Sequence, residues 1–154
     1  MSKILVVDDM AIFRDPLAAS LRLAGYETVC AVDGKEALAR VAEGRPDLVL
    51  LDLAMPVLDG LGFLRAFRAN PANARVPVIV LTAAAERKTV LEAASLGARE
   101  YMLKSRFSMG DMLERVKRRL EDPSAGAQSG TKLEPPPVAA AAGLSEAELR
   151  IRKS

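Results

Sequence analysis

Five short apolar runs, separated by longer stretches with helical periodicity, constrain the fold of this chain more than any other feature. The runs are rich in Val, Ile and Leu and are too short for core helices, so each one predicts a strand. Two of them, Leu48–Leu51 and Val78–Leu81, are unbroken rather than alternating, which indicates burial on both faces of a parallel sheet. The predicted strands are Lys3–Val7, Glu27–Val32, Leu48–Leu51, Pro77–Leu81 and Glu100–Leu103.

The stretches that follow the runs carry apolar residues at helical spacing. The first stops at Gly25 and the fourth at Gly97, and glycine is common just after a helix. We expect Asp59 and Gly60 to start the third helix. Pro16 lies inside the first, and we expect it in an early turn, where a missing N–H costs little. Five repeats of strand and helix predict an α/β fold with right-handed crossovers.

Composition excludes some chemistries. The chain has 154 residues, with 22 basic and 20 acidic side chains, and its net charge of +2 favours neither nucleic acid nor a membrane as partner. Histidine is absent, so no imidazole can act as base, nucleophile or metal ligand. The one cysteine, Cys30, predicts an inert core thiol and fits a reducing cytoplasm. We interpret a late basic cluster as a solvated helix face: Arg115, Lys117, Arg118 and Arg119.

The sequence changes character near its end. Residues 1–121 predict one domain, whereas residues 122–154 are rich in Pro, Ala, Gly and Ser and predict a linker or tail. Residues 144–152 predict a short helix, because Ser145 is followed three residues later by Glu148 in a capping-box pattern. A linker of this kind suggests a chain cut from a longer protein.

Reactive residues follow the predicted strands directly. Asp8 and Asp9 follow the first strand, Asp52 the third, Thr82 the fourth and Lys104 the fifth. In an open α/β sheet the carboxyl ends of the strands form one edge, where ligands bind. We therefore expect three carboxylates, one hydroxyl and one ammonium group to converge at that edge.

Such a cluster has a specific chemistry. Neighbouring carboxylates repel, so positive charge is expected among them. Lys104 supplies one charge, and Mg²⁺, the usual hard cation where phosphate is handled, supplies the rest. With a metal and a lysine holding phosphoryl oxygens, a carboxylate can act as nucleophile and form an acyl phosphate. The cluster therefore predicts magnesium-dependent phosphoryl transfer.

Four segments carry a family resemblance. The segment Asp-Leu-Ala-Met-Pro-Val-Leu-Asp-Gly at residues 52–60 resembles the phosphoacceptor loop of bacterial response regulators. The three other segments lie in the order and at the separations of a receiver domain, over roughly residues 3–120. They are Val6-Val7-Asp8-Asp9, Leu81-Thr82-Ala83 and Tyr101-Met102-Leu103-Lys104. The resemblance implies a doubly wound, five-stranded parallel sheet flanked by five helices.

The resemblance also implies roles for single residues. Asp52 is expected to accept the phosphoryl group, Lys104 to contact that group and Thr82 to donate a hydrogen bond to it. The implied protein ligands of Mg²⁺ are Asp8, Asp9, Asp52 and the backbone carbonyl of Ala54, with Asp8 acting mainly through water. A switch is also expected on physical grounds: Thr82 is pulled inward by the phosphoryl group, and the ring of Tyr101 is expected to fill the vacated space. By the resemblance, the surface that this reshapes is that of helix four, strand five and helix five.

Partners and location follow from the same resemblance. We expect phosphorylation by a sensor histidine kinase or a phosphotransfer protein, and a downstream effector or an output domain that the sequence does not identify. We further expect a cytoplasmic protein whose receiver domain contacts neither nucleic acid nor membrane. Phosphorylation-dependent formation of a homodimer is a further expectation.

One departure from the family keeps alternatives open. Ser105 follows Lys104 where receivers usually have proline, often after a cis peptide. A cis bond before serine costs about 3 kcal/mol, so either the bond is trans and Lys104 is placed differently, or the fold absorbs that cost. A receiver that binds its partner without phosphorylation therefore stays open. So does a magnesium-dependent phosphatase of the haloacid-dehalogenase type, although this type has Asp-x-Asp rather than adjacent aspartates after its first strand.

Overall fold

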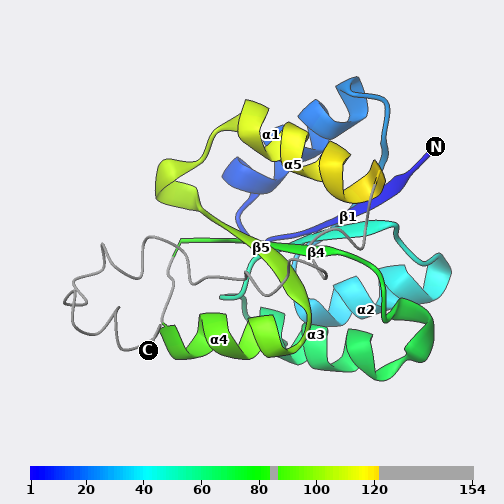
Figure 1. The fold of residues 1–154 in the computed structure, drawn as a ribbon, viewed down its shortest axis with the longest axis vertical. Coiled ribbons are helices and arrows are strands. Elements are labelled where there is room, and N and C mark those ends of the chain that lie inside the picture. Colours follow the sequence, from blue (N-terminus) through cyan, green and yellow to red (C-terminus); the bar gives the residue numbers. More distant parts are fainter. Residues whose placement is uncertain (84–86, 122–154) are drawn as a thin grey trace.

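The computed structural model describes residues 1–83 and 87–121, which form a parallel sheet with helices on both faces (Figure 1). The strand order is β2-β1-β3-β4-β5. The order reverses beside β1, and this reversal makes the sheet doubly wound. The strands are β1 (Lys3–Val7), β2 (Glu27–Ala31), β3 (Leu48–Leu51), β4 (Val78–Thr82) and β5 (Ala98–Leu103). The predicted tail and its short helix lie outside the described residues.

The helices divide between the two faces of the sheet. In Figure 1, α1 (Ala11–Leu23) and α5 (Met109–Glu121) cover one face. The other face is covered by α2 (Gly34–Glu43), α3 (Gly60–Ala69) and α4 (Arg87–Ser95). Two short 3-10 turns, η1 (Pro71–Asn73) and η2 (Lys104–Arg106), follow α3 and β5. The predicted doubly wound, five-stranded α/β fold is confirmed.

Each face of the sheet carries its own hydrophobic core. Alternate residues of β1, β3 and β4 enter the two cores, so these strands are buried on both sides. Every residue of β3 and β4 is buried, which is why their sequences are unbroken apolar runs. Beneath α2 to α4, the rings of Phe63 and Phe67 stack with centroids 5.2 Å apart. Packing on both faces holds the carboxyl edge of the sheet in place.

Four strand ends differ slightly from the sequence prediction, and β4 begins at Val78 rather than Pro77. Thr82 is the last residue of β4 rather than the first residue after it. β5 begins at Ala98, two residues before the predicted start at Glu100, and β2 ends at Ala31. Thr82 pairs with Leu103 in the β4–β5 ladder, so its backbone is fixed by the sheet.

Pro16 lies deeper in α1 than predicted. The helix begins at Ala11, so Pro16 is its sixth residue, beyond the early turn in which we expected it. That prediction is wrong because Met10 precedes the helix without a side-chain cap that would mark its start. At this depth the proline ring removes the hydrogen bond to the carbonyl of Ile12. Both residues are exposed, so the interruption faces solvent.

Helix ends follow the sequence more closely. Asp59 caps α3, because its side chain accepts a hydrogen bond from the N–H of Gly62 at 2.8 Å. Gly25 and Gly97 follow α1 and α4 with φ angles of 98° and 90°, in the left-handed region that favours glycine. The predicted start of the third helix and the two predicted stops are confirmed.

The basic cluster on α5 is only partly solvated. Glu100 on β5 is 9% exposed, with Arg115 Nη1 3.0 Å from Oε1 and Arg119 Nε 2.5 Å from Oε2. Arg118 is 3.7 Å from the same carboxylate and 56% exposed. The solvated-face prediction is therefore wrong for Arg115 and Arg119. The alternation of β5 turns Glu100 toward α5, and a buried carboxylate needs such partners.

Two core predictions agree with the structure. Met112 is fully buried between the sheet and the α1–α5 layer, and Met109 packs partly buried against the same core. Cys30 is half-buried there, and burial raises the pKa of its thiol. A raised pKa keeps the thiol protonated and poorly reactive.

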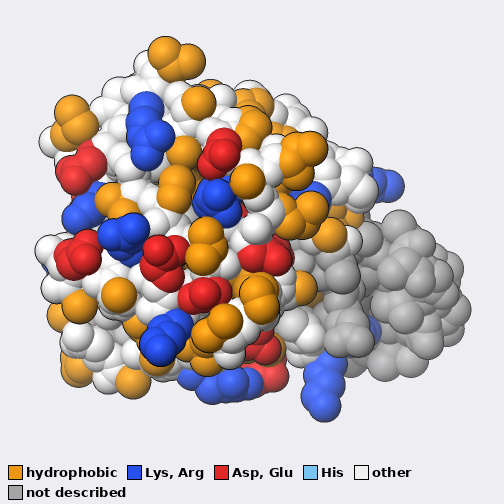
Figure 2. Space-filling model, turned by 180° about the vertical axis from the view of Figure 1, so that it is seen from behind, with side chains coloured by type: hydrophobic (Ala, Val, Ile, Leu, Met, Phe, Trp, Pro, Cys, Tyr) orange, Lys and Arg blue, Asp and Glu red, His pale blue; other side chains and the backbone are white. Residues whose placement is uncertain are grey.

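The described surface carries both signs of charge. Figure 2 shows Lys and Arg side chains interspersed with Asp and Glu across one face, with hydrophobic side chains between them. Within residues 1–83 and 87–121, no helix is long and apolar enough to cross a membrane.

Candidate functional site

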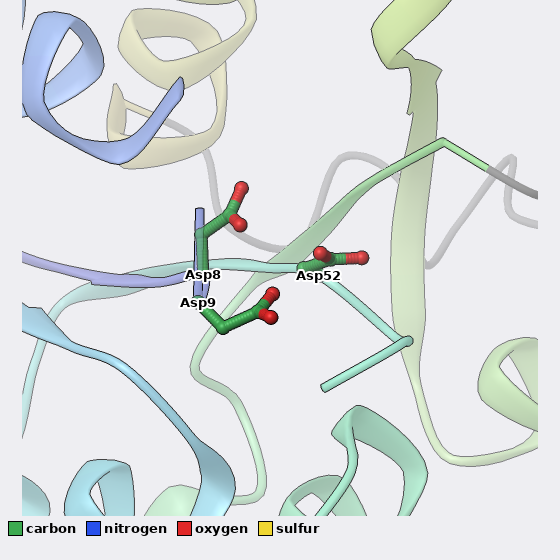
Figure 3. Close-up of side chains that lie close together, drawn as sticks. All are labelled: Asp8, Asp9 and Asp52. Atoms are coloured by element: carbon green, nitrogen blue, oxygen red, sulfur yellow. The ribbon is translucent and has the colours of Figure 1, made fainter. Parts of the chain in front are cut away.

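The aspartates predicted at strand ends meet at the carboxyl edge of the sheet (Figure 3). In the β1–β3 ladder Val7 lies opposite Leu51, and the next residues are Asp8 and Asp52. The N–H of Asp52 continues the ladder by donating to the carbonyl of Val7 at 3.0 Å. Asp9 comes next in the chain, and one oxygen from each of the three carboxylates lies within 4.8 Å of the others.

Lys104 lies between the two buried carboxylates. Its Nζ is 2.7 Å from Asp8 Oδ2 and 3.1 Å from Asp52 Oδ2, and its side chain is 8% exposed. Asp8 and Asp52 are 2% and 4% exposed, whereas Asp9 is open to solvent. The peptide bond between Lys104 and Ser105 is trans. The ammonium group therefore reaches both carboxylates without the usual proline.

Burial and charge act against each other in this cluster. Burial raises the pKa of Asp8; Lys104 opposes this rise, and the nearby charge of Asp52 adds to it. Burial also disfavours the charge of Lys104, but the two carboxylates outweigh it and raise the pKa of the ammonium group. The site thus keeps Lys104 charged while making the charge of Asp8 unfavourable without further cations.

Three residues around the start of α1 support the cluster and were missed by sequence reasoning. The N–H of Met10 donates to Asp8 Oδ1, and Arg14 Nη1 donates to the carbonyl of Asp8, each at 2.9 Å. Lys104 Nζ lies 4.8 Å from the ring centroid of Phe13, in a cation–π contact. Residues 10, 13 and 14 share one side of a helix. The spacing of these residues could have indicated that they lie together, but only if the start of α1 had been known.

The loop after β3 holds Asp52 through backbone contacts. The N–H of Ala54 donates to Asp52 Oδ1 at 3.2 Å. The N–H of Gly60 donates to the carbonyl of Leu53 at 3.0 Å. Ala54 itself is exposed, two residues after Asp52. The loop is therefore tied to the first residue of α3, and the position of Asp52 depends on that junction.

Val57, in the same loop, has an unfavourable backbone conformation. Its φ is 69°, and its side chain is 77% exposed. A β-branched residue is strained in the left-handed region, whereas asparagine tolerates it. We expect Val57→Asn to raise the free energy of unfolding by about 1 kcal/mol, measured by urea denaturation. Val32→Asn, at an exposed position without a positive φ, should give no gain. Equal effects of the two substitutions would contradict this explanation.

Thr82 and Tyr101 project to the same face of the sheet. Tyr101 pairs with Val80, and Thr82 pairs with Leu103 two residues further along each strand. Thr82 is buried, and the half-buried Tyr101 donates its hydroxyl to the carbonyl of Val90 on α4 at 3.0 Å. Burial raises the pKa of the Tyr101 hydroxyl above its usual range. Tyr101 thus connects β5 to α4 on the face that Thr82 also occupies.

The aspartate cluster fits a hard divalent cation. Its donors are carboxylate oxygens, which Mg²⁺ prefers. Asp8 Oδ2 is buried, and its close contact in the described part of the chain is the ion pair with Lys104 Nζ at 2.7 Å. Three ionised carboxylates beside one ammonium group leave two negative charges unbalanced, which one divalent cation would neutralise.

Known proteins share this fold and much of the sequence. The family model "Response regulator receiver domain" matches residues 4–117. Regulatory protein AtoC of Escherichia coli is 39% identical over 121 residues, covering 79% of this chain and 26% of AtoC. Transcriptional regulatory protein PrrA of Mycobacterium tuberculosis is 38% identical over 130 residues, covering 84% of this chain and 54% of PrrA. This chain therefore spans about a quarter to a half of these relatives.

Solved structures of known proteins have the same fold as this chain. The chemotaxis protein CheY4 of Vibrio cholerae superposes with a TM-score of 0.71 and 33% sequence identity. The match covers 77% of this chain and 98% of CheY4. The similarity therefore extends over nearly the whole length of that protein and over most of the residues described here.

Proposed function

Because the chain belongs to the response-regulator receiver family of two-component signalling, we propose that Asp52 is its phosphoacceptor and that phosphorylation of Asp52 is its signal. The main support is the position of Lys104 Nζ, 3.1 Å from Asp52 Oδ2 and 2.7 Å from Asp8 Oδ2. A phosphoryl group approaching an isolated carboxylate is repelled by it. A fixed ammonium group removes part of that repulsion before the reaction begins.

In the proposed transfer, a carboxylate oxygen of Asp52 attacks the phosphorus of a phosphohistidine on the donor protein. The P–O bond forms as the P–N bond breaks, and the imidazole leaves with the bonding electrons and takes a proton from solvent. Lys104 neutralises one phosphoryl oxygen, and the hydroxyl of Thr82 donates a hydrogen bond to another. Asp9 is the exposed member of the cluster, on the side from which a donor protein would approach.

Mg²⁺ is the proposed cofactor of this step. The residues that would hold it are Asp8, Asp9, Asp52 and the backbone carbonyl of Ala54. When bound, it supplies the charge neutralisation that lets the carboxylate and the phosphoryl group meet. The carboxylate donors of the cluster and its unbalanced negative charge support this assignment.

The signal would leave the site through Thr82 and Tyr101. When Thr82 turns toward the phosphoryl group, it vacates space on the face that it shares with Tyr101. The Tyr101 ring moves into that space and changes its contact with Val90, which alters the surface of α4, β5 and α5. A local change of charge is thus converted into a change of surface shape.

Amide shifts with a phosphoryl mimic test both the function and this route. Adding beryllium fluoride with Mg²⁺ should shift the amides around Asp52 and also those of α4 and β5. Thr82→Val, which keeps the shape of the side chain, should retain the first set and lose most of the second. Thr28→Val, a matched change of a buried threonine on β2, should retain both sets. Shifts on α4 that persist in Thr82→Val would reject the route, and no magnesium-dependent shift at Asp52 would reject the function.

The family is a signalling family, and we propose that this chain is not a turnover enzyme. A phosphatase of the haloacid-dehalogenase type would release phosphate continuously from small phosphomonoesters. We expect no such release beyond the slow hydrolysis of the aspartyl phosphate itself. Continuous release of phosphate over many turnovers would instead favour the phosphatase.

The remaining proposals concern the wider protein. Residues 1–121 form the receiver domain, and residues 122–154 act as a linker or tail. The relatives named as DNA-binding or transcriptional regulators are longer than this chain, which supports a further output domain or a separate effector. The proposed upstream partner is a sensor histidine kinase or a phosphotransfer protein. We place the protein in the cytoplasm and propose a phosphorylation-dependent homodimer, with no nucleic-acid or membrane contact by the receiver itself.

A further inference from the structure

A separate cavity lies at the amino-terminal edge of the sheet, opposite the aspartate cluster. Its volume of about 750 Å³ is in the range of small-molecule pockets. The walls come from the segment before β3, from η1 and the segment that joins it to β4, and from the second residue of β5. The length of β3 alone separates the two edges by about 13 Å. A small molecule in this cavity would therefore not touch Asp52.

The cavity has an excess of positive charge. Among its described lining residues, Arg45, Arg75 and Arg99 are basic and Asp47 is acidic. Asp47 Oδ2 already accepts a hydrogen bond from the backbone N–H of Lys3 at 2.7 Å. Two positive charges are thus left unbalanced. The rest of the lining is largely apolar and rigid: Pro46, Pro71, Ala72, Ala74, Val76 and Pro77.

Two guanidinium groups near the cavity lack acidic partners. Arg99 Nε is buried without a hydrogen bond, and in the described part of the chain neither Arg99 nor Arg68 pairs with a carboxylate. Arg68, just behind the wall, donates to backbone carbonyls among residues 1–83 and 87–121, including that of Gly97 at 3.1 Å. Burial and the neighbouring Arg99 lower the pKa of Arg68 to about 10. Burial and the neighbouring Arg119 also lower the pKa of Arg99. An anion in the cavity would relieve this repulsion.

We propose that this cavity binds a small molecule that carries a phosphate monoester. Such a group has a charge of about −1.5 to −2 at neutral pH, which matches the two unbalanced positive charges. Planar guanidinium groups bind pairs of phosphate oxygens, and Arg75 and Arg99 supply two of them. The prolines would pack against the organic part of the ligand. The site is independent of Asp52 and of phosphoryl transfer.

Amide shifts of the full chain, titrated with phenyl phosphate in the presence of EDTA, test the proposal. We expect saturable shifts confined to the amides of residues 45, 47, 72–76 and 98–100. Arg75→Gln and Arg99→Gln should each weaken binding by about tenfold or more, because each removes a charge-assisted hydrogen bond. Asp47→Asn should tighten binding, because it removes the one opposing charge. Lys35→Gln, at an exposed lysine away from the cavity, should change nothing.

The contrary outcomes are distinct. Shifts that do not saturate, or that gather around Asp52, would overturn the proposal. So would unchanged affinity in Arg75→Gln, which alters an exposed side chain and leaves the fold intact. A phosphoserine peptide that binds more tightly than phenyl phosphate would replace the small molecule with a protein partner. The same titration on Asp52→Asn should give the same affinity, so that failure here is distinguishable from failure of the phosphoacceptor role.

Discussion

Lys104→Met is expected to lower the free energy of unfolding of the metal-free protein by about 3 kcal/mol. Lys104 is the cation between Asp8 and Asp52, both of which are almost fully buried. Its removal leaves two buried carboxylates facing each other without compensation. Methionine has a similar length and can keep the contact with the ring of Phe13, so the loss reports charge rather than packing. Urea denaturation in EDTA measures it.

The same substitution should separate metal binding from phosphorylation. Mg²⁺ should stabilise Lys104→Met more than the wild-type protein, because the cluster has lost its internal cation. Phosphorylation by a small phosphodonor should nevertheless slow by about 100-fold or more, since one fixed charge at the reacting group is lost. Lys88→Met, at an exposed lysine on α4, is the matched control and should alter neither quantity. If Lys104→Met were as stable as the wild-type protein without metal, Lys104 would not be compensating the charges of Asp8 and Asp52.

Gly60→Ala is expected to destabilise the protein by about 3 kcal/mol and to impair phosphorylation of Asp52. A Cβ at Gly60 would lie 2.4 Å from the carbonyl oxygen of Asp52 and 2.6 Å from Cα of Leu53. Both are backbone atoms, so the loop itself must move. Because the N–H of Gly60 also holds Leu53, the displacement reaches the carboxylate of Asp52. Thermal unfolding and the rate of phosphorylation measure the two effects.

Gly110→Ala provides the control for this prediction. Gly110 is also near the start of a helix, but a Cβ there meets only Ser108 Oγ, at 3.9 Å. Alanine favours the helix by about 0.5–1 kcal/mol over glycine, so Gly110→Ala should stabilise the protein slightly. If both alanine variants behaved alike, the close approach of Gly60 to the acceptor loop would not explain the result.

The strands were predictable because strands buried on both faces consist of consecutive apolar residues. β1 and β3 are bounded as predicted, and the chain order of strand ends brought Asp8, Asp9, Asp52 and Lys104 to one edge. No fixed spacing between these residues was needed to predict that they meet, because the carboxyl ends of parallel strands lie on the same edge of the sheet. The fold and the meeting of these four side chains could therefore be predicted from the sequence.

Features that depend on one precise boundary or on register could not be predicted. The start of α1 has no polar cap. The helix start could therefore not be located from the sequence, so the position of Pro16 was predicted wrongly and the contacts of Met10 and Phe13 were not foreseen. The pairing of Glu100 with Arg115 and Arg119 needs the start of β5 and the direction of its alternation. The cavity lined by Arg99 draws on three distant segments, and its charge balance emerges only when they are brought together.

The most direct test of the central claim is the intact mass of the protein after incubation with acetyl phosphate and Mg²⁺. The wild-type chain should gain the mass of one phosphoryl group. Asp52→Asn should gain none, and neither should the wild-type chain in EDTA. Asp111→Asn, at an aspartate on α5 remote from the cluster, should be phosphorylated like wild type. A phosphoryl adduct on Asp52→Asn, or one that forms equally well in EDTA, would contradict the assignment of Asp52 and its metal.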